Sequence, residues 1–110
     1  MTENINAELA QVGLLREEIE ETLHNAIGTL TSLALEAGND KARVKRLRQK
    51  GDGVRKVLDI YGHKLKTVRK LDEANNLLAG IRTMGIIHTR NAPETEGWNL
   101  AVGYIEGYLR

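Results

Sequence analysis

Cysteine and phenylalanine are both absent from this chain of 110 residues. Without cysteine the protein can form neither a disulfide nor a thiolate metal site, and its composition fits a reducing compartment. The aromatic residues are one Trp and three Tyr. Leu, Ile, Val and Ala must therefore supply nearly all of the apolar core, which favours interdigitated helices over an aromatic-rich sheet.

Long hydrophobic runs are missing as well. No apolar stretch approaches the roughly 18–20 residues that span a bilayer. The first residues, Met1 to Asn4, lack the basic start and apolar run of a secretory signal. We expect a cytoplasmic protein with no membrane partner. It should fold as one domain, because 110 residues is close to the commonest domain size.

The net charge of +1 conceals an uneven distribution along the chain. Residues 40–70 hold twelve of the sixteen Lys and Arg and only three Asp, a local balance of +9. Residues 1–39 come to −6 and residues 71–110 to −2. Like charges at this density repel one another. The basic segment therefore needs phosphate, an acidic partner or the acidic segment of this chain to offset it.

The acidic N-terminal segment, residues 1–38, has the pattern of a long helix that needs a partner surface. Apolar residues recur at alternating spacings of four and three, which is typical of a coiled coil or a bundle helix. The partner can lie in the same chain or in a second copy, and we expect self-association. The candidate oligomerisation residues are Ile5, Leu9, Val12, Ile19, Leu23, Leu30 and Leu33. Gly38 can close this helix in the left-handed conformation.

The basic segment, residues 40–70, predicts two helices. We place the first at residues 41–50, capped by Asn39 or Asp40, and the second from Asp52 onward. The intervening Gly51-Asp52-Gly53 gives the rough outline of a helix-turn-helix. On the second helix one face is apolar and carries Val54, Val57, Leu58, Tyr61, Leu65 and Val68.

The C-terminal segment, residues 72–110, begins at Leu71-Asp72. There the side of the helix that carries the apolar residues shifts by about half a turn around the axis. We expect a helix capped by Asp72, a short extended stretch at 85–89 and a loop around Pro93. Residues 97–109 fit a helix starting near Thr95, which we favour, or a strand paired with 85–89 in a hairpin. The predicted fold is all-α, a bundle of about five helices.

Lys and Arg on successive helical turns can each reach a phosphate along a nucleic acid, which makes DNA or RNA the expected partner. Few aromatics lie in the basic segment, and Gln49 is its only amide suited to reading a base edge. Backbone contact should therefore dominate over sequence reading. The candidate nucleic-acid-binding residues are Lys41, Lys45 and Arg48 in one row, Arg55, Lys56, Lys66 and Lys70 in another, and Arg43, Arg46, Lys50 and Arg69.

The same charges allow a structural interpretation, in which the basic face is solvated or pairs with the glutamates at 17, 18, 20 and 21. It leads to a rival function. The protein would be a helical assembly or regulatory adaptor whose charged segments pair within or between subunits. Trp98, Tyr104 and Tyr108, beside the small residues Gly103 and Gly107, would then dock a protein partner. Alternatively, these aromatics complete the core.

The sequence contains only parts of two metal-binding motifs that occur in enzymes. Glu21-x-x-His24 has the spacing of one half of a di-iron helix motif, but the chain has no second copy. Glu17 with Glu20, or Glu18 with Glu21, resembles half of the acidic Mg²⁺ motif of small all-helical nucleotide pyrophosphohydrolases, and Glu36 with Asp40 misses the second half by one residue. We therefore predict no catalytic residue, no metal and no cofactor. The expected function is that of a small, dimeric, sequence-tolerant nucleic-acid-binding protein of bacterial or phage type.

Overall fold

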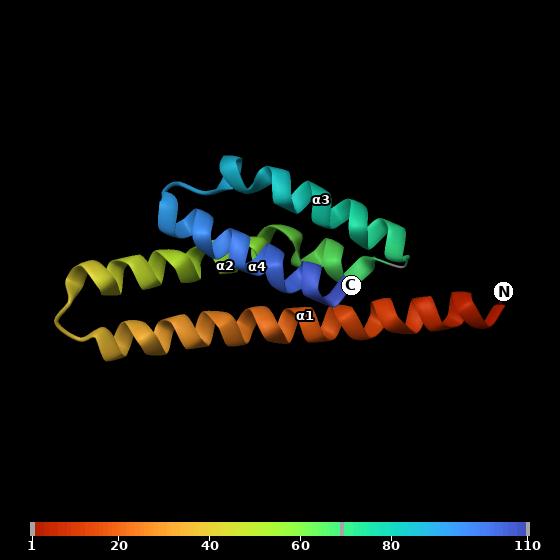
Figure 1. The fold of residues 1–110 in the computed structure, drawn as a ribbon, viewed down its shortest axis with the longest axis horizontal. Coiled ribbons are helices and arrows are strands. Elements are labelled where there is room, and N and C mark those ends of the chain that lie inside the picture. The colour runs from red at the N-terminus through yellow and green to blue at the C-terminus, as the bar shows by residue number, and fades with distance from the viewer. Residues whose placement is uncertain (1, 69, 110) are drawn as a thin grey trace.

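The computed structural model describes residues 2–68 and 70–109, and the side chains of residues 18–65, 67, 68, 70 and 72–107. It contains four helices: α1 (Thr2–Ala37), α2 (Lys41–Thr67), α3 (Leu71–His88) and α4 (Ala92–Leu109). No strand occurs in the part of the chain that the structure describes. The predicted all-α class is confirmed, with four helices in place of about five (Figure 1).

The helices α1 and α2 form an antiparallel hairpin joined by a tight turn. Gly38 adopts the left-handed conformation in this turn, with φ of 54°. Asp40 caps α2, because its side chain accepts a hydrogen bond from the Arg43 backbone N–H at 3.2 Å. Both features confirm the predicted end of the first helix and the predicted cap of the second.

The predicted break at Gly51-Asp52-Gly53 is wrong, because α2 runs through it without interruption. The glycines serve close packing and no turn. A Cβ atom added at Gly53 would collide with the backbone of Glu94 and Trp98, and one added at Gly97 would collide with the Lys50 carbonyl. Two helix backbones can approach this closely only where neither carries a side chain. Gly53 and Gly97 therefore mark the crossing of α2 and α4.

The C-terminal half differs from expectation at two places. A helix does begin at Leu71, but Asp72 lies inside its first turn and Lys70 occupies the cap position. Residues 85–88 continue α3, so the predicted extended stretch is wrong. The hairpin alternative is also wrong, because residues 92–109 form α4. This helix starts before Thr95, where Asn91 accepts a hydrogen bond from the Glu94 backbone N–H at 3.0 Å.

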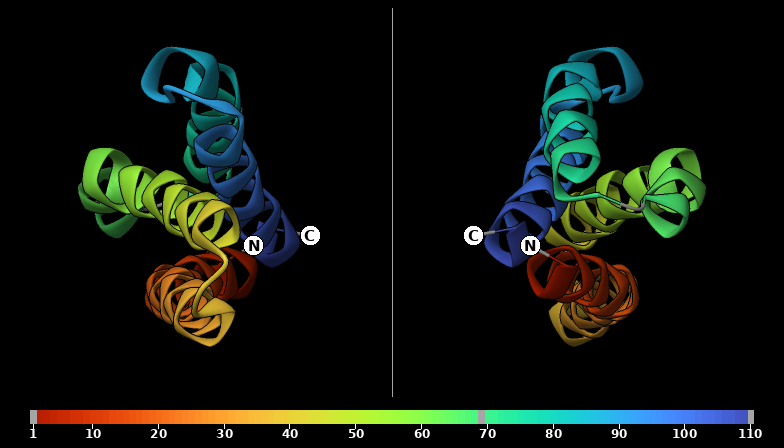
Figure 2. Two further views of the ribbon diagram at one scale, coloured as in Figure 1. Left: turned by 90° about the vertical axis from the view of Figure 1, so that its left-hand side faces the viewer. Right: turned by 90° about the vertical axis from the view of Figure 1, so that its right-hand side faces the viewer.

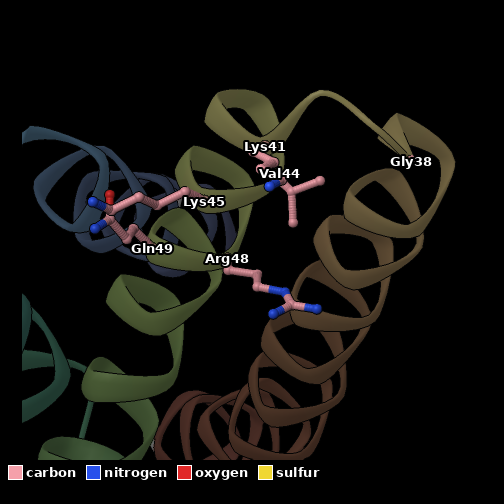
Figure 3. A pocket seen from close by; sticks show the side chains of 6 residues that line it. All are labelled: Gly38, Lys41, Val44, Lys45, Arg48 and Gln49. Carbon is pink, nitrogen blue, oxygen red and sulfur yellow. The ribbon is translucent and has the colours of Figure 1, made fainter.

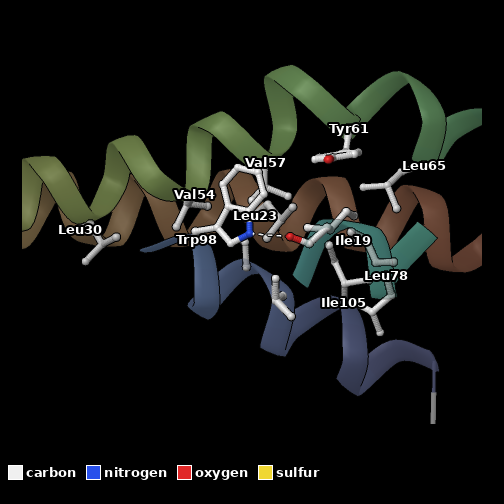
Figure 4. Packing of buried hydrophobic residues seen from close by; sticks show 13 residues of the cluster. Ile19, Leu23, Leu30, Val54, Val57, Tyr61, Leu65, Leu78, Trp98 and Ile105 are labelled. Atoms are coloured by element: carbon white, nitrogen blue, oxygen red, sulfur yellow. Dashed lines mark hydrogen bonds between the residues drawn. The ribbon is translucent and has the colours of Figure 1, made fainter. Parts of the chain in front are cut away.

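Trp98 lies at the centre of the core, with none of its side chain exposed. Its indole Nε1–H donates a hydrogen bond of 2.8 Å to the Ile81 carbonyl, as Figure 4 shows. The surrounding side chains come from all four helices and include Ile19, Leu23 and Leu30 of α1, Val54, Val57, Tyr61 and Leu65 of α2, Leu78 and Ile81 of α3, and Ala101, Val102 and Ile105 of α4. The apolar face predicted for α2 is thus confirmed.

The molecule is elongated, with principal extents of 58 × 26 × 20 Å. Viewed along its length, α1 lies on one side of α2 and α4, and α3 lies on the other side (Figure 2). Gly51 of α2 packs beside Leu30 of α1. From Leu30 and Gly51 toward the turn at Gly38, the α1–α2 hairpin projects past α3 and α4 (Figure 1). We call this projecting part, residues 31–50, the basic arm.

Candidate nucleic-acid interface

The basic arm carries six Lys and Arg residues and two acids, Glu36 and Asp40. Its cationic side chains all lie on α2, and those at 41, 43, 45, 46 and 48 are exposed. Lys50, at the base of the arm, is partly buried where α4 crosses. The high positive charge predicted for this stretch of sequence is therefore displayed on a part of the molecule that other helices leave open.

The row predicted from Lys41, Lys45 and Arg48 lies along one shallow groove of about 340 Å³ (Figure 3). Val44, Gln49 and the turn residue Gly38 complete its lining. Since α2 is continuous, Arg55 follows on the same side, about four turns from Lys41. Arg55 pairs with Asp52 at 3.7 Å, and both side chains are more than half exposed. Asp52 thus weakens the positive potential of the row outside the arm.

No ion pair joins a cation of the basic arm to any described carboxylate, although such pairs occur elsewhere in the molecule. The helix hairpin explains why the acidic cluster of α1 cannot neutralise the arm. Because Gly51 lies beside Leu30, antiparallel packing sets residues 17–21 level with about residues 60–64 of α2, some 15 Å along the axis from Lys50. Glu18 and Glu21 are exposed at that level.

Lys56 was predicted to contact phosphate, and the structure gives it another role. Its side chain turns inward, where it donates a hydrogen bond of 3.0 Å to the His88 carbonyl and pairs with the Glu94 carboxylate. The His88 carbonyl belongs to the last turn of α3 and has no partner within that helix. Lys56 therefore ties α2 to the junction of α3 and α4, and we remove it from the candidate interface.

Glu94 is the buried partner in this junction, with 5% of its surface exposed. The hydrogen bond and charge of Lys56 hold the pKa of the Glu94 carboxyl below its usual value, although burial opposes this shift. Glu94 also accepts a hydrogen bond of 2.9 Å from the Asn91 amide. Asn91 thus caps the start of α4 through the Glu94 backbone N–H, and its amide also holds the Glu94 carboxylate. Sequence analysis missed both residues, although their Asn-x-x-Glu spacing is a helix-start signature.

The remaining predicted nucleic-acid-binding residues are Lys66, Arg69 and Lys70. Lys70 is exposed at the start of α3. The side chains of Lys66 and Arg69 lie outside the described residues. The second predicted row, from Arg55 to Lys70, is therefore not brought together by the part of the structure that is described. The candidate interface consists of the six cations of the arm.

The predicted docking aromatics are separated by the fold. Trp98 is fully buried and is a core residue, so its assignment to protein interaction is wrong. Tyr104 is 38% exposed and lines a groove of about 240 Å³ between α1 and α4. The side chain of Tyr108 lies outside the described residues. The core alternative is therefore the correct one for Trp98.

Three of the predicted oligomerisation residues lie in the chain's own core. Ile19, Leu23 and Leu30 are buried there, and Leu33 is partly buried. For Ile19, Leu23 and Leu30 the partner surface is thus supplied by the same chain. The side chains of Ile5, Leu9 and Val12 lie outside the described residues.

Among the described residues, no group of three His, Asp or Glu side chains is arranged to hold a metal ion. In the same part of the chain, no helix is both long and apolar enough to cross a membrane. Comparison with protein-family models, with curated proteins and with solved structures found no match to this chain.

Proposed function

We propose that this protein binds nucleic acid through the basic arm, largely without regard to sequence, and catalyses no reaction. One observation carries the proposal. The two-helix arm carries six cationic side chains, five exposed and Lys50 partly buried at its base, and none of them has a carboxylate partner among the described residues. A polyanion would neutralise them and release its own condensed counterions, which is the main source of affinity in non-specific binding.

The composition of the arm supports contact with the phosphate backbone. Four of its six cations lie within about one and a half turns of α2, namely Lys45, Arg46, Arg48 and Lys50. The arm holds no aromatic side chain on which an unpaired base could stack. Phosphates contribute most to affinity, whereas base edges provide specificity. The expected binding is therefore sensitive to salt and tolerant of sequence.

Charge reversal at one arm residue tests this proposal against a matched control. Arg46 and Lys64 are both exposed, lie on α2 and are separated by five helical turns, so they point to the same side. Arg46→Glu should weaken binding to a random duplex by about tenfold at low salt. Lys64→Glu should weaken it by less than about threefold, because about 21 Å separates Lys64 from Lys50 at the base of the arm and salt screens charges beyond about 10 Å.

Fluorescence anisotropy of a labelled duplex gives both affinities, and circular dichroism shows whether each variant keeps its helices. Equal losses for the two variants would mean that only net charge matters, and that the arm is not the interface. Absence of binding by the unchanged protein would remove the proposed function altogether.

A second candidate function is an assembly adaptor, and one observation favours it. Glu18 and Glu21 are exposed near the middle of α1, while the unpaired arm projects from the turn end of the hairpin (Figure 1). Two copies could pair these segments reciprocally. Sedimentation equilibrium would then give a dimer at low salt that dissociates at high salt, and Arg46→Glu would abolish it. A monomer at all salt concentrations removes this candidate.

A further inference from the structure

Four of the six cations of the basic arm lie on two opposite flanks of α2. Lys41 and Arg43 are two residues apart, as are Arg48 and Lys50, so each pair is separated by about 200° around the helix axis. Lys41 and Arg48 occupy one flank, and Arg43 and Lys50 occupy the other. A helix that only rested on a single phosphate strand would need positive charge on one flank.

Between these flanks lies a face that points away from α1. Val44 and Leu47 are the partly buried residues of this stretch that face α1. Ala42 and Gln49 fall on the opposite side of the helix, with Lys45 and Arg46 beside them. Figure 3 shows Lys45 and Gln49 directed away from α1. The outward face thus has a small residue, an amide and two cations, with no acid among them.

We infer that residues 41–49 of α2 enter the major groove of B-form duplex DNA. The inference rests on the proposed function and deepens it by naming the nucleic acid. An α-helix with its side chains is about 10–12 Å across, and the major groove of B-DNA is about 12 Å wide. The two charged flanks then face the two phosphate strands that border the groove. The other helix of the arm, α1, packs on the opposite side of α2 and stays outside the groove.

Other nucleic acids fit this arrangement less well. The major groove of A-form RNA is deep and narrow, so the same helix cannot enter it. A single strand offers only one line of phosphates, which would leave one flank of α2 without a partner. Duplex DNA satisfies both flanks at once.

The outward face also predicts what the arm can read in the groove. Gln49 can form two hydrogen bonds with the adenine edge, and Lys45 or Arg46 can donate to guanine. Ala42 at the centre leaves room for the helix to approach the bases. Because one amide and two mobile cations make up the whole reading surface, sequence preference should be weak.

Blocking the major groove is the direct experiment. Anisotropy titrations at low salt would compare a random DNA duplex, the same duplex with glucosylated 5-hydroxymethylcytosine filling the major groove, and a duplex RNA of the same sequence. We expect the modified DNA and the RNA each to bind at least about tenfold more weakly than plain DNA. Equal affinity for all three overturns the major-groove inference while leaving nucleic-acid binding intact. Failure to bind any of them removes the proposed function as well.

A variant pair tests the same geometry from the protein side. Ala42→Glu places a carboxylate at the centre of the outward face and should weaken binding to plain DNA by at least about tenfold. Ala79→Glu makes the same change at an exposed position on α3 and should alter affinity by less than about threefold. If Ala42→Glu, still helical by circular dichroism, binds as tightly as Ala79→Glu, the outward face does not contact DNA.

Discussion

Gly53 of α2 and Gly97 of α4 meet where these two helices cross, and a Cβ atom added to Gly97 would lie 3.2 Å from the Gly53 Cα. The nearer obstacle for that Cβ is the Lys50 carbonyl. Backbone atoms cannot move aside as a flexible side chain can. The crossing therefore fixes where the first turns of α4 pack against α2, and with it the length of arm that projects beyond α4.

Alanine substitutions at these glycines should destabilise the protein. We expect Gly53→Ala and Gly97→Ala each to lower the free energy of unfolding by about 3 kcal/mol or more, because the helices must separate to admit a methyl group. Gly62→Ala is the control, since a Cβ there meets nothing within 4 Å. It should raise the free energy of unfolding by about 0.5–1 kcal/mol. Urea unfolding followed by circular dichroism measures all three.

The ion pair between Lys56 and Glu94 should make stability depend on pH in a predictable direction. Because the folded pKa of Glu94 is lowered, its contribution is fully present above the unfolded pKa of about 4.3 and is lost as pH falls through the folded value. Glu94→Gln should lower the free energy of unfolding by about 3 kcal/mol near pH 7. The difference between this variant and the unchanged protein should shrink below about pH 4.

An exposed ion pair provides the control for this experiment. Glu106 and Arg82 pair at 2.6 Å on the surface. Glu106→Gln should change the free energy of unfolding by less than about 1 kcal/mol. Equal losses from the two Glu→Gln variants, or a Glu94→Gln difference that does not vary with pH, would contradict the role given to Glu94.

Substitutions at two leucines of α1 should distinguish a core position from an exposed one. Leu23 is fully buried, whereas Leu35 at the arm is 73% exposed. Leu23→Asp should abolish the helical fold, because replacing a buried leucine by alanine already removes about 2–5 kcal/mol and a carboxylate adds a desolvation penalty. Leu35→Asp should leave helix content and thermal stability nearly unchanged. A folded Leu23→Asp protein with a reduced sedimentation mass would instead place Leu23 between subunits.

The two described aromatics of α4 should behave differently on truncation. Trp98→Ala should lower the free energy of unfolding by about 3–5 kcal/mol, because it removes the centre of the core and the partner of the Ile81 carbonyl. Tyr104→Ala should lower it by less than about 1 kcal/mol. Thermal unfolding measures both. Similar losses would mean that Tyr104 is packed as firmly as Trp98.

The helical periodicities of the sequence correctly predicted the core face of α2 and the helix boundary at Leu71. They failed at Gly51-Asp52-Gly53, because a glycine can either make a turn or permit close helix packing, and local sequence does not distinguish the two. One signal could have done so. Leu47 and Val54 lie seven residues apart and therefore on the same side of one continuous helix.

Two other predictions from the sequence failed because contacts between distant parts of the chain decide the outcome. Ile86 and Ile87 are β-branched and suggest a strand, yet both are exposed at the end of α3, where the helix is held by Trp98 packing on Gly85. Lys56 resembles its basic neighbours in sequence. Its partner Glu94 lies 38 residues away, so only the fold reveals that its charge is already neutralised.

The salt dependence of binding tests the central claim most directly. The logarithm of the association constant for a random DNA duplex should fall linearly with the logarithm of salt concentration, with a slope of about −5 if all six arm cations contact phosphates. Replacing Lys41, Lys45 and Arg48 together by Gln should reduce the magnitude of this slope by about 3. Flat anisotropy at low salt with micromolar protein, or a slope that the triple variant leaves unchanged, would contradict nucleic-acid binding through the basic arm.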